Sequence, residues 1–187
     1  MKSGMFLLMS IFLIAGCKTT SKLGNHREII QHTYAFPQDW VGLYQGNLVI
    51  YPTIGDTTQI KMELIIDQPD ALGLYPWVIK YGDKDVRYYG LEAINTEKGH
   101  YRIDEYNSIK IDGYLRDNHF TTHFDVTSNK LIFYYERVPE GIEIRVHIYG
   151  LEPVSETGGE VIGEEKVPTV ESFALKAFQV ASLRKVK

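Results

Sequence analysis

The fold is decided by His119–Tyr149, HFTTHFDVTSNKLIFYYERVPEGIEIRVHIY. Apolar and polar residues alternate along this stretch in three runs, which are separated by Ser128-Asn129 and by Pro139–Gly141. Because successive side chains of a strand point to opposite faces of a sheet, such alternation predicts strands with one buried face. Short breaks rich in Gly, Pro, Asn and Ser predict tight turns. The stretch therefore predicts three antiparallel strands joined by hairpins.

The same pattern continues towards the N-terminus as far as Trp40, and no convincing helix interrupts it. A wide antiparallel sheet of this kind tends to curl, and closure into a barrel removes its exposed edges. We therefore expect an all-β fold, an antiparallel up-and-down β-barrel of about 8–10 strands, with a β-sandwich as the alternative. The further predicted strands are Trp40–Tyr51, Gln59–Asp67, Tyr75–Tyr81, Asp85–Ile94, His100–Asp104 and Ile109–Leu115.

Two C-terminal segments break the regular pattern. Glu152–Thr169 is rich in Glu, Gly and Pro, which predicts a long acidic loop that is disordered, with a lid over one end of the barrel as the alternative. Val170–Val186 fits both a helical stripe and a strand face. We favour a strand, because a helix would leave Trp40–Tyr51 as a bare edge, whereas a final strand would close the barrel.

The N-terminus has the features of a secretory signal peptide. Lys2 precedes the almost wholly apolar run Met5–Leu13, which is too short to span a bilayer. The ending Ile14–Cys17 resembles the lipobox of bacterial lipoproteins, which implies that Cys17, the single cysteine, is acylated and becomes the new N-terminus. Lys18 follows, and in lipoprotein sorting as known for enteric bacteria the absence of Asp there favours the outer membrane.

The predicted domain organisation follows from these segments. We expect a signal peptide over residues 1–16, a lipidated Cys17 with a flexible tether over 17–36, and one barrel domain over 37–187 that includes the acidic loop 152–169. The localisation predicted from the resemblance is the cell envelope, with the protein held on a membrane by its lipid.

Composition and motifs exclude several functions. The net charge of −4 and the lack of a Lys/Arg run argue against a nucleic-acid partner. The sequence has no Gly-x-Ser-x-Gly, phosphate loop or dinucleotide fingerprint, so we expect neither an enzyme nor a cofactor. His119 and His123 would share a strand face at about 13 Å, too far apart for one metal ion. Strand carboxylates such as Asp104 and Asp125 are interpreted as cross-strand partners of Lys110, Lys130 and Arg137.

The aromatic residues are the strongest remaining signal, at 12% of the chain. Adjacent pairs such as Tyr88-Tyr89 and Tyr134-Tyr135 must place one ring inside and one outside a barrel. A barrel of this size is either filled by its side chains or holds one small ligand. If it holds a small apolar ligand, the candidate ligand-binding residues are Trp77, Tyr81, Tyr114, Phe124 and Tyr135.

The alternation and the aromatic content resemble the calycin group of lipocalin-, avidin- and fatty-acid-binding-like barrels at the level of architecture. The Gly-x-Trp near the first lipocalin strand is absent, and Trp40-Val41-Gly42 stands in reverse order. Tyr51–Ile54 is similar to a stretch of the nitrobindin-like haem barrels, which would require an axial histidine, for which His147 is the nearest candidate.

The sequence therefore predicts an envelope lipoprotein whose barrel binds a small apolar ligand or a membrane-associated partner. Two alternatives stay open. One is a structural or adaptor lipoprotein that acts on an envelope protein through its surface, and the other, less favoured, is an envelope enzyme.

Overall fold

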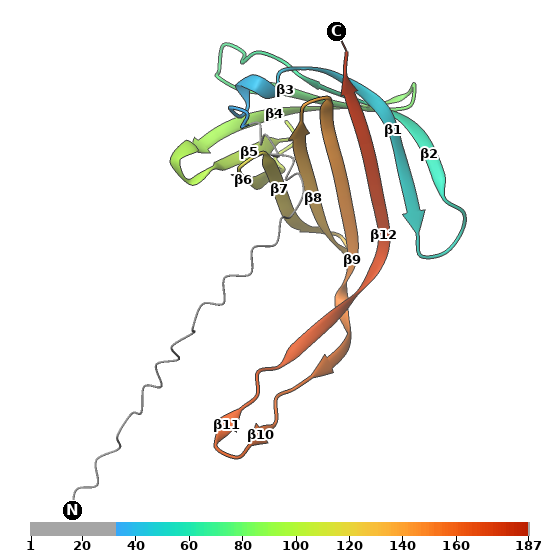
Figure 1. Ribbon diagram of the computed structural model, residues 1–187, viewed down its shortest axis with the longest axis vertical. Helices are drawn as coiled ribbons and strands as arrows, with labels where there is room; N and C mark the ends of the chain where they lie inside the picture. The colour runs from blue at the N-terminus through green and yellow to red at the C-terminus, as the bar shows by residue number, and fades with distance from the viewer. Residues whose placement is uncertain (1–32, 187) are drawn as a thin grey trace, which may run out of the picture. The chain divides into compact units, whose positions relative to one another are not determined.

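The computed structural model describes residues 33–186, and they form a closed barrel of ten antiparallel strands (Figure 1). The order around the barrel is β1-β12-β9-β8-β7-β6-β5-β4-β3-β2, so neighbours in sequence are neighbours in space except where β12 closes the sheet. This confirms the predicted up-and-down barrel and rejects the sandwich. The barrel strands are β1 (Gly42–Pro52), β2 (Thr58–Ile66), β3 (Tyr75–Tyr81), β4 (Asp85–Asn95), β5 (His100–Asp104), β6 (Lys110–Arg116), β7 (His119–Val126), β8 (Asn129–Val138), β9 (Gly141–Thr157) and β12 (Val170–Lys185).

Several predictions from the sequence concern residues outside the part of the chain that the structure describes. These are the signal peptide 1–16, the lipidation of Cys17 and the tether as far as residue 32. Within residues 33–186, no helix is long and apolar enough to cross a membrane. The described helices are two short 3-10 turns, η1 (Gln38–Trp40) and η2 (Thr96–Lys98).

The period-two pattern places the apolar residues inside the barrel. In β2, Met62, Leu64 and Ile66 are buried, whereas Lys61 on the opposite face is exposed and Glu63 is half-buried. The same alternation runs round the other strands, because each strand has one face on the interior and one on the solvent. The core is therefore a single cluster enclosed by the sheet.

The barrel closes because β12 pairs with β1 over nine residue pairs, from Tyr44 opposite Lys185 to Pro52 opposite Ala177. The prediction of a strand over 170–186 is confirmed. Gly46 allows the close approach at this seam, since a Cβ on it would lie 2.3 Å from the carbonyl oxygen of Ser182. The seam thus needs a residue without a side chain at this inward position.

One end of the barrel is plugged by the segment that precedes β1. Phe36 and Trp40 are 7% and 0% exposed, and their rings meet edge-to-face at 4.8 Å. Phe36 also packs on Tyr101 at 4.7 Å and on Phe120 at 5.0 Å. The expectation of a flexible tether up to residue 36 was therefore wrong for its last residues, because burial of Phe36 fixes them to the core.

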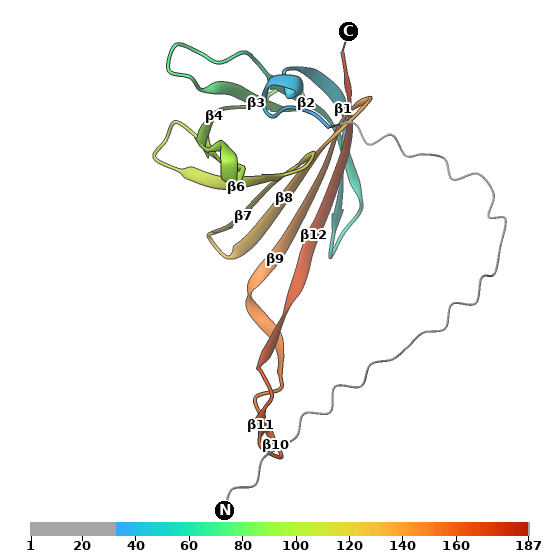
Figure 2. The ribbon, with the colours of Figure 1, turned by 60° about the vertical axis from the view of Figure 1, so that its left-hand side comes forward.

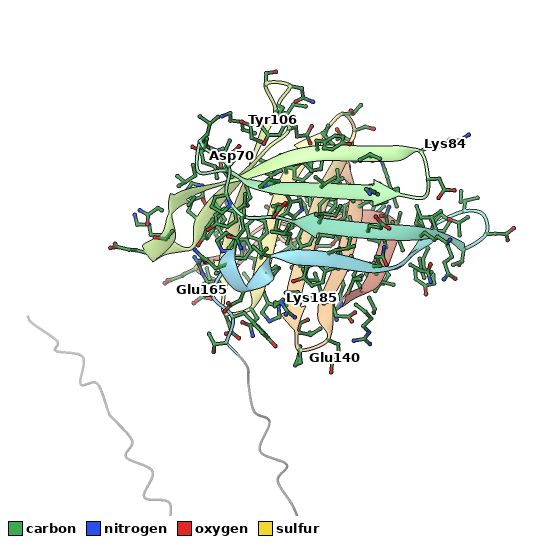
Figure 3. All side chains as sticks on the ribbon, turned by 90° about the horizontal axis from the view of Figure 1, so that it is seen from above. Asp70, Lys84, Tyr106, Glu140, Glu165 and Lys185 are labelled. Carbon is green, nitrogen blue, oxygen red and sulfur yellow. The ribbon has the colours of Figure 1, made fainter. Side chains whose placement is uncertain are left out.

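Arg137 holds the plug in place. It is buried, and its guanidinium donates hydrogen bonds to the carbonyl oxygens of Val138, Gly141 and Asp39, so the predicted cross-strand carboxylate partner was wrong for this residue. It also lies over the ring of Tyr34 at 4.4 Å. Backbone carbonyls can satisfy a buried guanidinium with five donors. At this end of the barrel the Lys185 backbone N–H donates to the Glu140 carbonyl at 3.0 Å, and both residues are labelled in Figure 3.

The predicted disordered loop 152–169 is instead part of a β-hairpin arm. β9 and β12 continue past the barrel, and β10 (Val161–Ile162) pairs with β11 (Glu165–Lys166) near the tip (Figure 2). The loop prediction was wrong because cross-strand pairing continues through the Glu- and Pro-containing stretch, with register shifts near Phe173. The arm points away from the barrel in both views, so it is not a lid (Figures 1 and 2).

Truncation of Phe36 tests the plug. We expect Phe36→Ala to lower the free energy of unfolding by about 3–5 kcal/mol, because it removes a buried ring that contacts four others, those of Trp40, Trp77, Tyr101 and Phe120. The exposed Thr33→Ala should stay within about 0.5 kcal/mol of wild type. Urea unfolding followed by circular dichroism measures both, and equal effects of the two changes would show that the segment is not part of the core.

Candidate functional site

A cavity of about 500 Å³ lies inside the barrel and opens at the end opposite the plug. Its deep part is formed by buried residues such as Trp77 and Tyr135, and its mouth by the half-exposed Ile109 and Val126. This size falls within the range of small-molecule sites. The remaining lining residues are Ile79, Tyr81, Arg87, Tyr89, Ile103, Glu105, Lys110, Ile111, Thr122, Phe124, Asp125, Leu131 and Phe133.

Aromatic rings form one wall of the cavity. Phe124, Phe133 and Tyr135 come from β7 and β8 and stack nearly parallel, with centroids 5.9 Å and then 6.3 Å apart. Trp77 meets Tyr135 edge-to-face at 5.3 Å. Since inward positions recur every second residue, Phe133 and Tyr135 of one strand present neighbouring rings to the same space. The wall is flat, apolar and held by ring contacts.

A second hollow of about 260 Å³ adjoins the first, and Tyr81, Arg87, Leu131 and Phe133 line both. It extends along β1, β2 and β9, where its walls are aliphatic. The other lining residues of this hollow are Leu48, Ile50, Ile60, Asp85, Val146, Ile148 and Gln179. An elongated apolar molecule therefore has room in two directions from Arg87.

Arg87 is the charged group at the junction of the two hollows. Its guanidinium donates to both carboxylate oxygens of Asp85, at 3.2 Å and 3.0 Å, and lies 4.9 Å from the ring centre of Tyr81. This hydrogen-bonded pairing is the main cause that raises the pKa of Arg87 and lowers the pKa of Asp85. The cation is therefore already matched by an anion on its own strand.

The other charged residues at the mouth are also paired. Lys110 contacts Asp104 at 3.0 Å, and Lys130 contacts Asp125 at 3.0 Å, as predicted from the sequence. Glu105 accepts a hydrogen bond from the Asn107 side-chain amide at 3.3 Å. The mouth thus carries both signs of charge with no strong excess of either.

Three phenols share the polar part of the interior. Burial raises the pKa of Tyr135, and nearby Tyr81 and Tyr89 raise it further. Burial likewise raises the pKa of Tyr81 to about 12, against a smaller lowering by Arg87. The pKa of Tyr89 is raised mainly by burial, although Arg87 hydrogen-bonds its hydroxyl. All three side chains therefore stay protonated and neutral at physiological pH.

Four of the five sequence candidates come together in the cavity: Trp77, Tyr81, Phe124 and Tyr135. Tyr114 does not. It lies on the outer face of β6, 47% exposed, with its ring stacked on His100 at 4.9 Å. Its placement in the site was wrong, because Gly113 and Leu115 take the inward positions of that strand.

The sequence analysis did not single out Arg87, Thr122 or Leu131 as site residues. The alternation carried a signal for two of them, since Thr122 is two residues before the predicted Phe124 and Leu131 is four residues before the predicted Tyr135. It carried none for Arg87, because the sequence did not show which of Tyr88 and Tyr89 faces inward. The adjacent tyrosine pairs behave as predicted, with Tyr88 and Tyr134 exposed while Tyr89 and Tyr135 line the cavity.

His147 cannot serve as the axial ligand that the nitrobindin resemblance requires. It lies on the outer face of β9 and contacts Phe178 at 5.0 Å and Tyr149 at 6.2 Å. The described residues hold no group of three or more His, Cys, Asp and Glu side chains arranged for a metal ion. His100 is paired with Asp112 at 2.8 Å on the outside of the barrel.

Comparison with known proteins supports the architecture. No protein-family model matches the chain, and no curated protein matches it. A solved structure does: a protein of unknown function from the DUF3598 family of Nostoc punctiforme PCC 73102, at 10% identity and a TM-score of 0.56. The match covers 80% of this chain and 48% of that one, so the chain spans about half its length. At this identity the likeness shows a shared barrel fold and nothing about activity, lipidation or lipocalin membership.

The shifted phenols predict a loss of stability at alkaline pH. Above about pH 10, tyrosines of the unfolded chain release protons while Tyr81 and Tyr135 keep theirs, so the unfolded state binds fewer protons. The free energy of unfolding should then fall as pH rises towards about 12. Tyr135→Phe should make this fall shallower, whereas the outward neighbour Tyr134→Phe should change it less. Urea unfolding at a series of alkaline pH values measures the difference, and parallel falls in the two variants would contradict burial of the Tyr135 phenol.

Proposed function

We propose that this protein is a lipid-anchored module of the cell envelope whose barrel binds a small, mostly apolar ligand. The observation that carries the proposal is the cavity of about 500 Å³, walled by the stacked rings of Phe124, Phe133 and Tyr135 and open at one end of the barrel. Pockets of this size with apolar walls and a few polar groups are the usual form of small-molecule sites.

The closed end of the barrel supports the same proposal. Among residues 33–186, the plug around Phe36 and Arg137 fills the other end, so a ligand would enter and leave at the mouth, beside Arg87 and Val126. Water inside an apolar cavity of this size gains little from its walls, and an apolar ligand that replaces it removes apolar surface from water. Binding therefore needs no rearrangement of the sheet.

The anchor is proposed on the resemblance of Ile14–Cys17 to a lipobox. Each buried methylene of an acyl chain adds about 0.8 kcal/mol of membrane affinity, and two chains give stable attachment. A membrane-bound barrel of this kind would hold its ligand close to the bilayer, with the outer membrane as the proposed location in a host that has one.

The proposal that a ligand occupies the cavity is tested by a substitution that fills the cavity with a larger side chain. Leu131→Trp places a large ring where both hollows meet, and Ile132→Trp is the matched control on the outer side of the same strand. We expect the affinity for N-phenyl-1-naphthylamine, a neutral apolar dye, to fall at least about tenfold in Leu131→Trp and to change by less than about twofold in the control.

Fluorescence titration measures this affinity in the full chain, and native mass spectrometry of protein purified without detergent reveals any ligand carried from the cell. Equal dye binding in wild type and Leu131→Trp would overturn the cavity as the site. The adaptor alternative would then gain support, with the exposed apolar residues Val154, Val161 and Ile162 of the arm as its contact surface.

The proposed lipid anchor is tested by removing the thiol of Cys17, the group that would be acylated. Cys17→Ala removes the thiol that would carry the lipid, so we expect this variant to lose incorporation of a palmitate analogue and to leave the membrane fraction. Cell fractionation and labelling in a bacterial host measure both effects, with Ser21→Ala as the control that should stay labelled. A Cys17→Ala protein that remains labelled and sediments with membranes would contradict the lipid anchor.

A further inference from the structure

Three side-chain hydroxyls line the cavity without a hydrogen-bond partner among residues 33–186. Thr122 and Tyr135 are 5% and 6% exposed, and both line the cavity together with Tyr81. Within residues 33–186, none of these three hydroxyls has a hydrogen-bond partner. The hydroxyls are accessible from the cavity, since among residues 33–186 the one buried side-chain polar atom without a partner is Nε1 of Trp40, so they can donate to an acceptor that a ligand brings.

The free donors are neutral, while the charged groups are engaged. Arg87 is held by Asp85, Lys110 contacts Asp104, and the hydroxyls remain protonated. An anionic head group would have to share a cation that is already paired with a carboxylate, or lie in an apolar space without a counter-ion, and the latter costs more than placing a neutral carbonyl there. A carbonyl oxygen needs only a hydroxyl donor.

We infer that the cavity selects a neutral amphiphile with a hydrogen-bond-accepting head, such as a long-chain ester or ketone, over the corresponding carboxylate. Its carbonyl oxygen accepts hydrogen bonds from the hydroxyls of Tyr81 and Tyr135, with Thr122 as a further donor. Its apolar chain lies against Phe124 and Phe133 and extends into the hollow beside Ile148. This inference rests on the proposed function and specifies the ligand class of the same site.

The test uses a matched pair of ligands, methyl dodecanoate and dodecanoate, which share the chain and differ in head group. Each displaces N-phenyl-1-naphthylamine from the full chain carrying Cys17→Ala, at about pH 8, where the carboxyl is ionised. We expect the ester to bind at least about tenfold more tightly than the carboxylate. Tyr135→Phe keeps the ring and removes the hydroxyl, and it should weaken the ester about three- to tenfold more than it weakens the dye, which has no carbonyl to accept the hydrogen bond.

Tyr134→Phe is the control, because this neighbour lies on the outer face and should leave ester affinity unchanged. Circular dichroism of Tyr135→Phe reports whether the variant is folded. A carboxylate that binds as tightly as the ester, or a Tyr135→Phe variant with unchanged ester affinity, would overturn this inference while dye binding upholds the proposed function. If the dye, the ester and the carboxylate all fail to bind, the result overturns both the proposed function and the inferred ligand class.

Discussion

The pairing of β1 with β12 is the constraint on which the rest of the structure depends. These strands are far apart in the sequence, and their nine residue pairs join the edges of the sheet. Without this seam, the backbone groups of both strands would be unpaired and the apolar face would be open to water. Gly46 permits the close approach, so closure depends on the absence of a side chain as well as on hydrogen bonding.

Closure gives the barrel two different ends. At one end Phe36 and Trp40 enter the interior, and Arg137 satisfies its buried charge on backbone carbonyls. At the other end no comparable segment of residues 33–186 enters, and the inward side chains surround a cavity instead of meeting each other. Packing at the plugged end stabilises the sheet, so the residues around the cavity are free to be arranged for binding.

The inward and outward faces could be predicted from the sequence because they depend only on the period of a strand. This is why Trp77, Tyr81, Phe124 and Tyr135 were found. The prediction that Tyr114 lines the cavity was wrong for the same reason. Gly113 occupies the inward position beside it, so Tyr114 must face outwards. The arm was missed because Glu and Pro are poor strand formers, and pairing across the hairpin overrides that local preference.

The sequence by itself determined the strand content, the alternation and the all-β class, because these follow from local chemistry along the chain. Tertiary structure alone decided that Phe36 belongs to the core, that Arg87 pairs with Asp85 inside the mouth, and that a cavity remains above Tyr135. A packed core and a pocket require the same alternation, so only the register and closure of the sheet distinguish them. Register and closure set the distance between opposite walls of the barrel, and no local sequence pattern encodes that distance.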